Sequence, residues 1–372
     1  MTVITSVPNF PIGRPLPPYR NRPYQRETID GISVIRVWTF LAPNRGILLR
    51  SIDFLSFSVS ALLAGLFQQA DVIVATSPQL LTGMAAWWLA VLKRRPWVFE
   101  VRDLWPDSIV SVGAMDRNLF IRALAVLERN LYNHANRIIA VSDGVRERLL
   151  AKAVPPQKIG VVWNGVDLSR AAPRTPSAPL IESLNFRGSF VVGYVGTHGM
   201  AQALEVVLDA ARILHGNNVR FLFVGEGARR EALLSYAAEL KLENARFVGL
   251  VPLETAAEHI AICDAILIPL KRTDQIEITI PAKIFEAAAM EKPMIVAAEG
   301  ASADLILRYG AGLVVPPEDP SSLAAAITQL RDDQGLREQL KAGCRALAYD
   351  FNRQKLALDM LQHIRLALPS AS

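Results

Sequence analysis

Short runs of apolar, β-branched residues alternate along the chain with segments in which apolar residues recur every three or four positions. The runs predict buried strands, and the periodic segments predict helices that cover a sheet. In the first half we expect strands at 2–6, 32–37, 71–75, 97–101, 137–141 and 158–163. The helices expected there are 47–69, 80–92, 118–134 and 145–151, and residues 14–28, rich in Arg and Pro, are expected to form a loop.

The pattern stops at residues 168–188, which contain Pro173, Pro176 and Pro179, and this composition predicts an interdomain linker. A second alternating series follows. Its expected strands are 190–195, 220–224, 245–248, 265–269, 293–297 and 312–315, and 270–279 is expected as a loop. Its expected helices are 201–214, 229–240, 253–263, 281–289, 303–309, 319–332, 334–348 and 351–368. Alternation of this kind predicts an α/β fold with parallel, doubly wound sheets.

The length and composition support two domains. The chain has 372 residues, of which 51% are hydrophobic and 20% charged, so two domains of roughly 150–200 residues can each form a core. The two cysteines, Cys263 and Cys344, lie in apolar or helical settings. This usage favours a reducing compartment and argues against a disulfide framework or a cysteine metal site.

Charge is unevenly distributed. Residues 1–170 contain 20 Lys and Arg against 12 Asp and Glu, and the remainder contains 20 against 23. A basic first half favours an anionic partner, either a membrane surface or an acceptor that carries a diphosphate. The arginines are scattered and no nucleic-acid motif is present, so we expect no nucleic-acid partner.

Two apolar runs in the first half are candidates for contact with a membrane. The first residues show no signal peptide pattern. The apolar runs 54–67 and 80–92 are shorter than the roughly 20 residues that a membrane-spanning helix needs. We expect both to be core helices, with contact at a membrane interface as the alternative.

The segment Ile280–Glu286 carries the main candidate chemistry. Lys283 and Glu286 stand one turn apart near the start of the expected helix. An ammonium beside free backbone N–H groups can hold phosphate, and a carboxylate can accept hydrogen bonds from ribose hydroxyls. The alternative is a salt pair without a ligand.

Two glycine-containing loops follow expected strands in the same half. They are Gly196-Thr197-His198-Gly199, whose backbone N–H groups could cradle a diphosphate, and Gly225-Glu226-Gly227, which could line a nucleotide base pocket. The alternative is two ordinary turns. Arg229 and Arg230, at the start of the next helix, are expected to be solvated.

In the first half, Ser77 and Arg102-Asp103 stand at the carboxyl ends of expected strands, where such sheets bind ligands. The Asp103 carboxylate could position or deprotonate an acceptor hydroxyl, or it could cap local backbone. The histidines show no metal spacing and no Asp-x-Asp pair is present. We therefore expect a metal-independent mechanism.

Taken together, these elements resemble glycosyltransferase family 4, the retaining enzymes of the GT-B fold, in their bacterial exopolysaccharide, capsule and O-antigen branch, with a likeness to fucosaminyltransferases. The resemblance covers nearly the whole chain. It is carried by TVITSVPNFPIG (2–13), DGISVIRV (30–37), VRDLWPD (101–107), NGVD (164–167), VGYVGTHG (192–199), FVGEG (223–227) and PAKIFEAAAMEKP (281–293).

The resemblance implies two Rossmann-like domains. Residues 1–170 would bind the acceptor, 171–188 would link the domains, 189–350 would bind a nucleotide sugar, and 351–372 would return to the first domain. Glu286 would bind ribose, Lys283 and the Gly196–Gly199 loop would face the diphosphate, and Asp103 would lie near the acceptor. Asp103, Lys283 and Glu286 are thus the implied catalytic residues, with Ser77 and Arg102 on the acceptor side. The donor site would further include Gly225, Glu226, Gly227, Val248, Glu277, Pro281, Ala282 and Ile284.

The sequence departs from the family pattern in three places. The family has two glutamates eight positions apart, whereas Ile278 stands eight before Glu286 and Glu277 is one residue off. The usual Arg and Lys after the Gly196 strand are replaced by Gly-Met-Ala-Gln-Ala, which leaves Lys283 as the cation for the diphosphate. Relatives also begin with a strand, a glycine-rich loop and a helix before the equivalent of Thr2–Ser6. Without that unit we expect unpaired backbone, an open core and low activity.

The resemblance implies a glycosyltransferase that moves a hexose or N-acetylhexosamine from a nucleotide sugar, UDP-linked by family habit, to a polyprenyl-diphosphate-linked saccharide. No further cofactor is expected, and the enzyme would be cytoplasmic and peripheral at the inner face of the bacterial plasma membrane. Two alternatives remain, a sugar-nucleotide epimerase of the same shape and a truncated, inactive remnant that only binds nucleotide.

Overall fold

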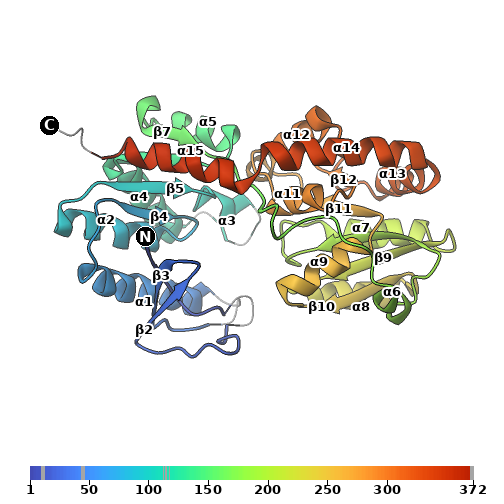
Figure 1. The fold of residues 1–372 in the computed structure, drawn as a ribbon, viewed down its shortest axis with the longest axis horizontal. Coiled ribbons are helices and arrows are strands. Elements are labelled where there is room, and N and C mark those ends of the chain that lie inside the picture. The colour runs from blue at the N-terminus through green and yellow to red at the C-terminus, as the bar shows by residue number, and fades with distance from the viewer. Residues whose placement is uncertain (10–12, 43–46, 112, 114, 117, 369–372) are drawn as a thin grey trace. The chain divides into compact units, whose positions relative to one another are not determined.

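The computed structural model describes residues 1–9, 13–42, 47–111, 113, 115–116 and 118–368. The chain forms two compact units, the first of Met1–Val162 with Asp359–Ser372 and the second of Trp163–Leu358 (Figure 1). Both are α/β units with mostly parallel strands, as the alternating pattern predicts. The units divide at Val162, so 163–170 belongs to the second unit. The expected linker contains a short helix, α6 (Ala178–Ser183).

The second unit is organised around one six-stranded sheet of order β10-β9-β8-β11-β12-β13, in which every pairing is parallel. Its strands are β8 (Phe190–Val195), β9 (Val219–Val224), β10 (Ala245–Gly249), β11 (Ala265–Pro269), β12 (Met294–Ala297) and β13 (Gly312–Val315). Its helices are α6, α7 (Leu204–Ile213), α8 (Arg230–Glu239), α9 (Leu253–Ala261), α10 (Asp274–Glu277), α11 (Ala282–Ala289), α12 (Ala301–Tyr309), α13 (Pro320–Asp332) and α14 (Gln334–Asp350). The strand order reverses between β8 and β11, which is where sheets of this kind bind ligands.

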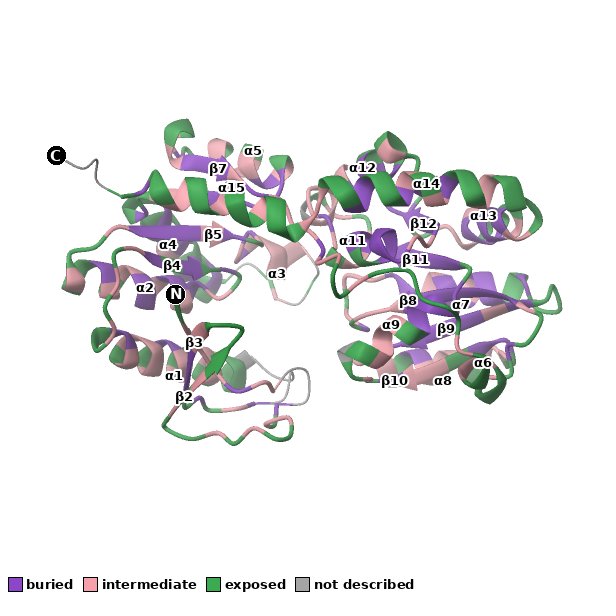
Figure 2. Ribbon diagram, viewed as in Figure 1, coloured by how far each residue is buried: buried purple, intermediate pink, exposed green. Residues whose placement is uncertain are grey.

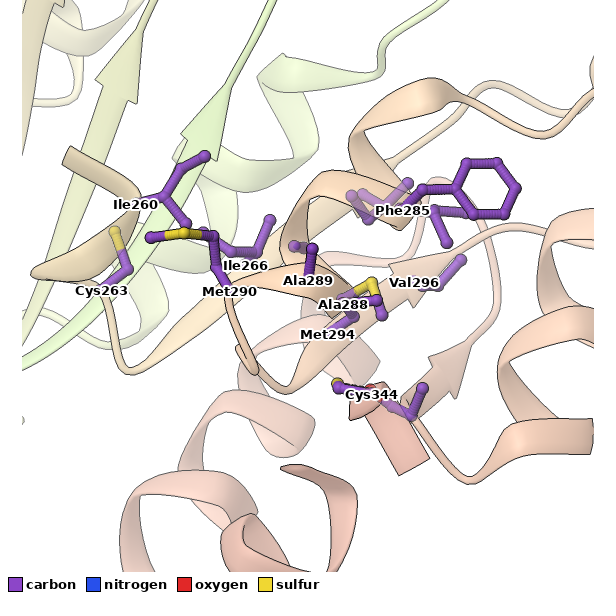
Figure 3. Close-up of a cluster of buried hydrophobic side chains, with 14 of the residues drawn as sticks. Ile260, Cys263, Ile266, Phe285, Ala288, Ala289, Met290, Met294, Val296 and Cys344 are labelled. Carbon is purple, nitrogen blue, oxygen red and sulfur yellow. Dashed lines mark hydrogen bonds between the residues drawn. The ribbon is translucent and has the colours of Figure 1, made fainter. Parts of the chain in front are cut away.

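Two buried apolar clusters pack against the two faces of this sheet. The cluster in Figure 3 joins Phe285 and Ala288 of α11 to Val296 of β12 and to both cysteines. The cysteines are unpaired, and burial raises the pKa of each thiol to about 12, so both stay neutral packing residues. This agrees with their expected apolar settings.

The first unit contains a three-stranded sheet, β1-β3-β2, and a four-stranded parallel sheet, β4-β5-β6-β7. The strands are β1 (Thr2–Thr5), β2 (Tyr24–Ile29), β3 (Ile32–Val37), β4 (Ile73–Thr76), β5 (Trp97–Val101), β6 (Arg137–Ala140) and β7 (Ile159–Val161). The helices are α1 (Ile47–Leu66), α2 (Leu80–Lys93), α3 (Asp107–Ser111), α4 (Leu119–His134), α5 (Asp143–Ala151) and the 3₁₀ turn η1 (Pro156–Lys158). In the described part of the chain, β1 and β4 are outer strands of their sheets.

The segment 24–28, expected as part of a loop, is instead a strand that pairs antiparallel with β3. Asp30 and Gly31, both with positive φ, make the tight turn between the two strands. A salt bridge of 2.6 Å between Arg36 and Glu27 ties them across the hairpin. The expectation failed because the charged residues of an edge strand dilute the apolar signal.

Helix α1 corrects the expectation of a core helix. Its 19-residue stretch Leu48–Leu66 has a mean hydropathy of 1.4, yet only 11% of that stretch is buried. By length and composition alone this helix could cross a membrane. By contrast, α2 buries Leu80, Ala86 and Ala90 and matches the expectation.

Helix α15 (Arg353–Arg365) starts in the second unit, and its residues from Asp359 onward belong to the first. There, Arg137 donates hydrogen bonds to Nδ1 of His363 at 2.9 Å (Nη2) and 3.2 Å (Nε). Gly160 leaves room for that ring, since a Cβ at this position would lie 2.5 Å from Cε1 of His363. The last helix of the chain thus returns to the first unit.

Candidate functional site

The strongest candidate site of the second unit lies where β8 and β11 separate. The two strands pair through Ala265 with Val192 and Ile266 with Gly193, at the amino end of β11 and the middle of β8. Their carboxyl ends, which lead into Gly196 and Leu270, are no longer paired with each other. The strand order predicts that a ligand binds at this edge of the sheet.

The two glycine loops come together at this edge. The Gly196 amide donates to the Val224 carbonyl at 2.9 Å, and the His198 amide donates to the Glu226 carbonyl at 2.9 Å. Gly225 has a φ of +138°, and a Cβ there would collide with the Gly196 carbonyl oxygen. Only glycine permits this approach, so the loops form one backbone layer rather than two separate turns.

Lys283, in the first turn of α11, lies over that layer. Its Nζ donates to the Tyr194 hydroxyl at 2.7 Å, and that hydroxyl donates to the Thr197 carbonyl at 2.6 Å. The ammonium is also 3.9 Å from the centre of the Tyr194 ring, within the range of a cation–π contact. A Cβ on Gly196 would lie only 3.0 Å from Nζ. Lys283 and the Gly196 loop therefore lie together in one site.

Burial lowers the pKa of Lys283 to about 7, an effect that the nearby charge of Glu286 partly offsets. Burial raises the pKa of Tyr194, which keeps its hydroxyl protonated. An ammonium that titrates near neutrality is sensitive to any anion placed beside it. A diphosphate at this position would hold Lys283 in its charged form.

His198 is fully buried within the loop layer. Its ring centroid lies 5.8 Å from that of Tyr194 and 6.1 Å from that of Phe247. Burial, followed by the charges of Arg230 and Lys283, lowers its pKa to about 4, so the ring is neutral at pH 7. Among the described residues neither ring nitrogen has a hydrogen-bond partner, which is unusual for a buried polar group.

Arg230 adds a second cation to the site. Its Nε is 3.2 Å from the Glu226 carboxylate, and its side chain is only 22% exposed. The expectation of a solvated arginine is therefore wrong for Arg230. Arg229, which pairs with Glu205 and is 45% exposed, is closer to that expectation. The start of α8 therefore adds a positive charge beside the glycine loops.

The remaining predicted donor residues fall into two groups. Glu286 and Ala282 are exposed at the start of α11, and Pro281 precedes that helix as its N-cap. Ile284 is completely buried in the core, and the partly buried Val248 packs against that core.

Glu277 ends α10, which forms where the sequence predicted a loop. Thr273 caps this short helix by accepting a hydrogen bond from the Ile276 amide at 3.3 Å. A Cβ on Gly300 would collide with the Glu277 carbonyl oxygen. The backbone at Glu277 is therefore held against the loop that follows β12.

In the first unit, Ser77 joins the ends of β4 and β5. Its hydroxyl accepts from the amides of Arg102 at 2.8 Å and Asp103 at 3.2 Å, and donates to the Asp103 carbonyl. Ser77 is 3% exposed, so it positions these residues and offers no free surface. The three predicted acceptor-side residues are thus brought together.

Burial raises the pKa of the Asp103 carboxyl. The Ser108 hydroxyl and the Leu104 amide oppose this shift by donating hydrogen bonds to the carboxylate. A partly buried carboxylate that accepts two hydrogen bonds from the protein can still accept a proton, or a hydrogen bond from a hydroxyl group.

Each of the two units matches a known protein family. Residues 189–333 match the family described as glycosyl transferases group 1, and residues 1–165 match the glycosyl transferase 4-like domain. The two matches together span most of the chain. The chain belongs to the glycosyltransferases.

Several relatives of this glycosyltransferase are named for the biosynthesis of colanic acid or teichuronic acid. It is 26% identical to the probable glycosyltransferase WbjE of Pseudomonas aeruginosa, over 74% of this chain and 70% of that protein. It is 25% identical to the putative colanic acid biosynthesis glycosyltransferase WcaL of Salmonella typhimurium, over 61% of this chain but only 56% of that protein. Its fold is similar to that of Anabaena Alr3699/HepE in complex with UDP and glucose, with a TM-score of 0.73 at 19% identity, over 90% of this chain and 86% of that one. The GT-B fold is thereby confirmed.

Sequence reasoning missed Tyr194 and the role of Arg230 at this glycosyltransferase site. Tyr194 stands two residues before Gly196 at the carboxyl end of β8. A hydroxyl-bearing residue in an otherwise apolar strand end, beside a glycine loop, was the available signal. Within the described chain, no group of three or more His, Cys, Asp or Glu side chains is placed to hold a metal ion.

Proposed function

We propose that this glycosyltransferase moves a hexose or N-acetylhexosamine from a UDP-sugar to a lipid-linked saccharide in bacterial surface polysaccharide synthesis. The observation that carries the proposal is the position of Lys283 over the Gly196 loop, at the reversal point of the strand order. The relatives named for colanic acid and teichuronic acid biosynthesis support the pathway, and the complex of the Anabaena protein with UDP and glucose supports the choice of nucleotide.

In this proposal the donor diphosphate rests on the backbone of the Gly196–Gly199 loop, with Lys283 and Arg230 as its cations. Glu286 accepts hydrogen bonds from the ribose hydroxyls. Asp103 of the first unit holds the acceptor hydroxyl. The family resemblance supports transfer with retention.

In the transfer step, the acceptor oxygen bonds to the anomeric carbon as the bond to the diphosphate oxygen breaks. The hydroxyl proton passes to the leaving diphosphate. Lys283 and Arg230 stabilise the charge that develops there, so no metal ion is required in the proposal. The enzyme works as a peripheral protein at the inner face of the plasma membrane.

The test is a transfer assay with a panel of UDP- and GDP-sugars, with and without a polyprenyl-diphosphate-linked saccharide. We expect transfer that needs both substrates, survives EDTA and gives a product with the donor's anomeric configuration by NMR. Conversion of the donor sugar without an acceptor would instead identify an epimerase. Donor binding without turnover would identify a nucleotide-binding remnant.

A further inference from the structure

The outer face of α1 is an apolar stripe. Its members recur at intervals of three or four residues, and so lie on one side of the helix. The stripe consists of Leu48, Ile52, Leu55, Val59, Leu63 and Leu66, and each of these side chains is classed as exposed, Leu48 at 73% and Leu63 at 55%. A surface helix of a soluble domain ordinarily shows polar residues on this side.

Two serine side chains of α1 make their hydrogen bonds within the protein. The Ser56 hydroxyl accepts from the Phe40 amide at 2.8 Å and donates to the Asp53 carbonyl at 2.8 Å. Ser58 is 2% exposed and donates to the Phe54 carbonyl. The helix therefore satisfies these two hydroxyls within the protein and presents the apolar stripe to the outside.

One side of α1 is packed into the first unit. A Cβ on Gly65 would lie 2.7 Å from the Leu89 side chain of α2 and 3.5 Å from Ile4 of β1. Lys93, the last residue of α2, donates to the Leu66 carbonyl at 2.8 Å. Because the helix is anchored in this way, its stripe fits a surface on which it lies rather than a bilayer that it crosses.

Basic and aromatic side chains accompany the stripe. Arg94 and Arg95, both exposed, follow the partly buried Lys93, whose ammonium contacts the end of α1. Phe67, just beyond the stripe, is 86% exposed, and Trp88 of the adjacent α2 is 49% exposed. Figure 2 shows exposed positions along both helices. Apolar side chains with basic residues beside them are complementary to anionic lipid headgroups above hydrocarbon.

An apolar groove of about 730 Å³ runs beside the stripe. Leu63 and Phe67 line it from α1 and its end, and Tyr24, Val37 and Trp38 line it from the β2–β3 hairpin. A groove that opens beside the stripe offers room for hydrocarbon from the same surface.

We propose that the outer face of α1, with Arg94 and Arg95, is the surface by which this protein docks on an anionic phospholipid membrane. The role of this docking rests on the proposed function, because a lipid-linked acceptor has to be reached at the bilayer. The docking itself needs neither donor nor acceptor. Its test is therefore independent of sugar transfer.

The experiment is flotation of the full chain with vesicles of pure phosphatidylcholine and with vesicles that also contain the anionic lipid phosphatidylglycerol, which attracts basic surface segments. The variant Leu55→Gln/Val59→Gln/Leu63→Gln removes the centre of the stripe. Its matched control is Leu307→Gln/Leu358→Gln, at side chains of the second unit that are 64% and 63% exposed. Circular dichroism and the melting temperature establish that every variant is folded.

We expect the wild type and the control to float with anionic vesicles and the stripe variant to bind at least tenfold less. Arg94→Gln/Arg95→Gln is expected to weaken binding to anionic vesicles only, and to reduce its dependence on salt. The proposal is overturned if the wild type stays unbound, or if the stripe variant binds like the control. It is also overturned if light scattering shows a dimer of the wild type that only the stripe variant loses, since a second copy would then be the occupant.

Discussion

At the scale of single residues, Lys283 combines a fixed position with a pKa near neutrality. Its Nζ is held by the Tyr194 hydroxyl at 2.7 Å, and burial lowers its pKa to about 7. The charge of Lys283 should therefore change both with pH and when an anionic ligand binds. Its position depends on the hydrogen bond to the Tyr194 hydroxyl.

Replacing Lys283 by Met should weaken UDP binding by about 10- to 100-fold, the usual contribution of a charged hydrogen bond. In the wild type, UDP affinity should fall as the pH rises from 7 to 9, because the free protein loses the ammonium that the diphosphate needs. Lys283→Met should show no such fall. Isothermal titration with UDP at several pH values measures both effects, and Lys341→Met, at an exposed ion pair with Glu338, is the control.

The lowered pKa of Lys283 also makes the stability of the fold depend on pH, in the direction opposite to the change in UDP affinity. The folded-state value of about 7 lies below the ordinary 10.5 of lysine, so the unfolded chain binds more protons between these values. The contribution of Lys283 to the free energy of unfolding therefore rises with pH across this window. Ligand affinity and stability should move in opposite directions there.

Replacing Tyr194 by Phe should reduce UDP affinity by roughly three- to tenfold, the contribution of one neutral hydrogen bond. The ring and its contact with the ammonium remain, but Lys283 loses its positioning hydroxyl. Because the ring is kept, the melting temperature should change little. A variant that binds UDP as tightly as the wild type, with the same pH profile, would show that Tyr194 has no positioning role.

At the scale of elements, the paired glycine loops are the feature on which the donor site depends. Gly225→Ala should destabilise the second unit by about 2–4 kcal/mol. The new Cβ would collide with the Gly196 carbonyl oxygen, and alanine is also strained at the positive φ of this position. Gly216→Ala is the matched control, since Gly216 has a φ of +83° with open space around it. It should cost only about 1 kcal/mol. Urea unfolding measures both, and equal losses would contradict the role of the contact.

Most elements were predictable because the apolar runs and the helical periods are locally encoded. The strand order and the short pairing of β8 with β11 were not, since they arise from contacts between distant residues. The hairpin strand β2 was missed because its exposed, charged residues carry little apolar signal. The core helix expected at 54–67 was wrong, because a continuous apolar run does not reveal which side will be covered.

In the candidate site, too, locally encoded features could be predicted from the sequence and contacts between distant residues could not. Lys283 and the Gly196 loop could be picked out because a cation at a helix start and a glycine-rich strand end are recognisable in sequence. Arg230 was misjudged because its burial depends on Glu226 and His198, which only the folded loops bring beside it. Tyr194 was missed since its partner, Lys283, is 89 residues away.

At the scale of the whole molecule, the chain consists of two units with separate cores, and α15 belongs partly to each. We expect UDP to raise the temperature of one unfolding transition, that of the second unit, and to leave the other unchanged. Calorimetry with and without UDP tests this, and Lys283→Met should abolish the shift. A single transition that moves as a whole would show that the two units unfold together.

The two-sheet arrangement of the first unit has a consequence for handling the protein. Among the described residues, β1 and β4 each have one neighbour in a sheet, so each presents a second row of backbone amides and carbonyls without a partner strand. Unpaired edges of this kind are templates on which strands from other chains assemble. Concentrated solutions should therefore form β-rich aggregates on gentle warming, earlier than the melting of either core, and a proline placed in β4 should delay them.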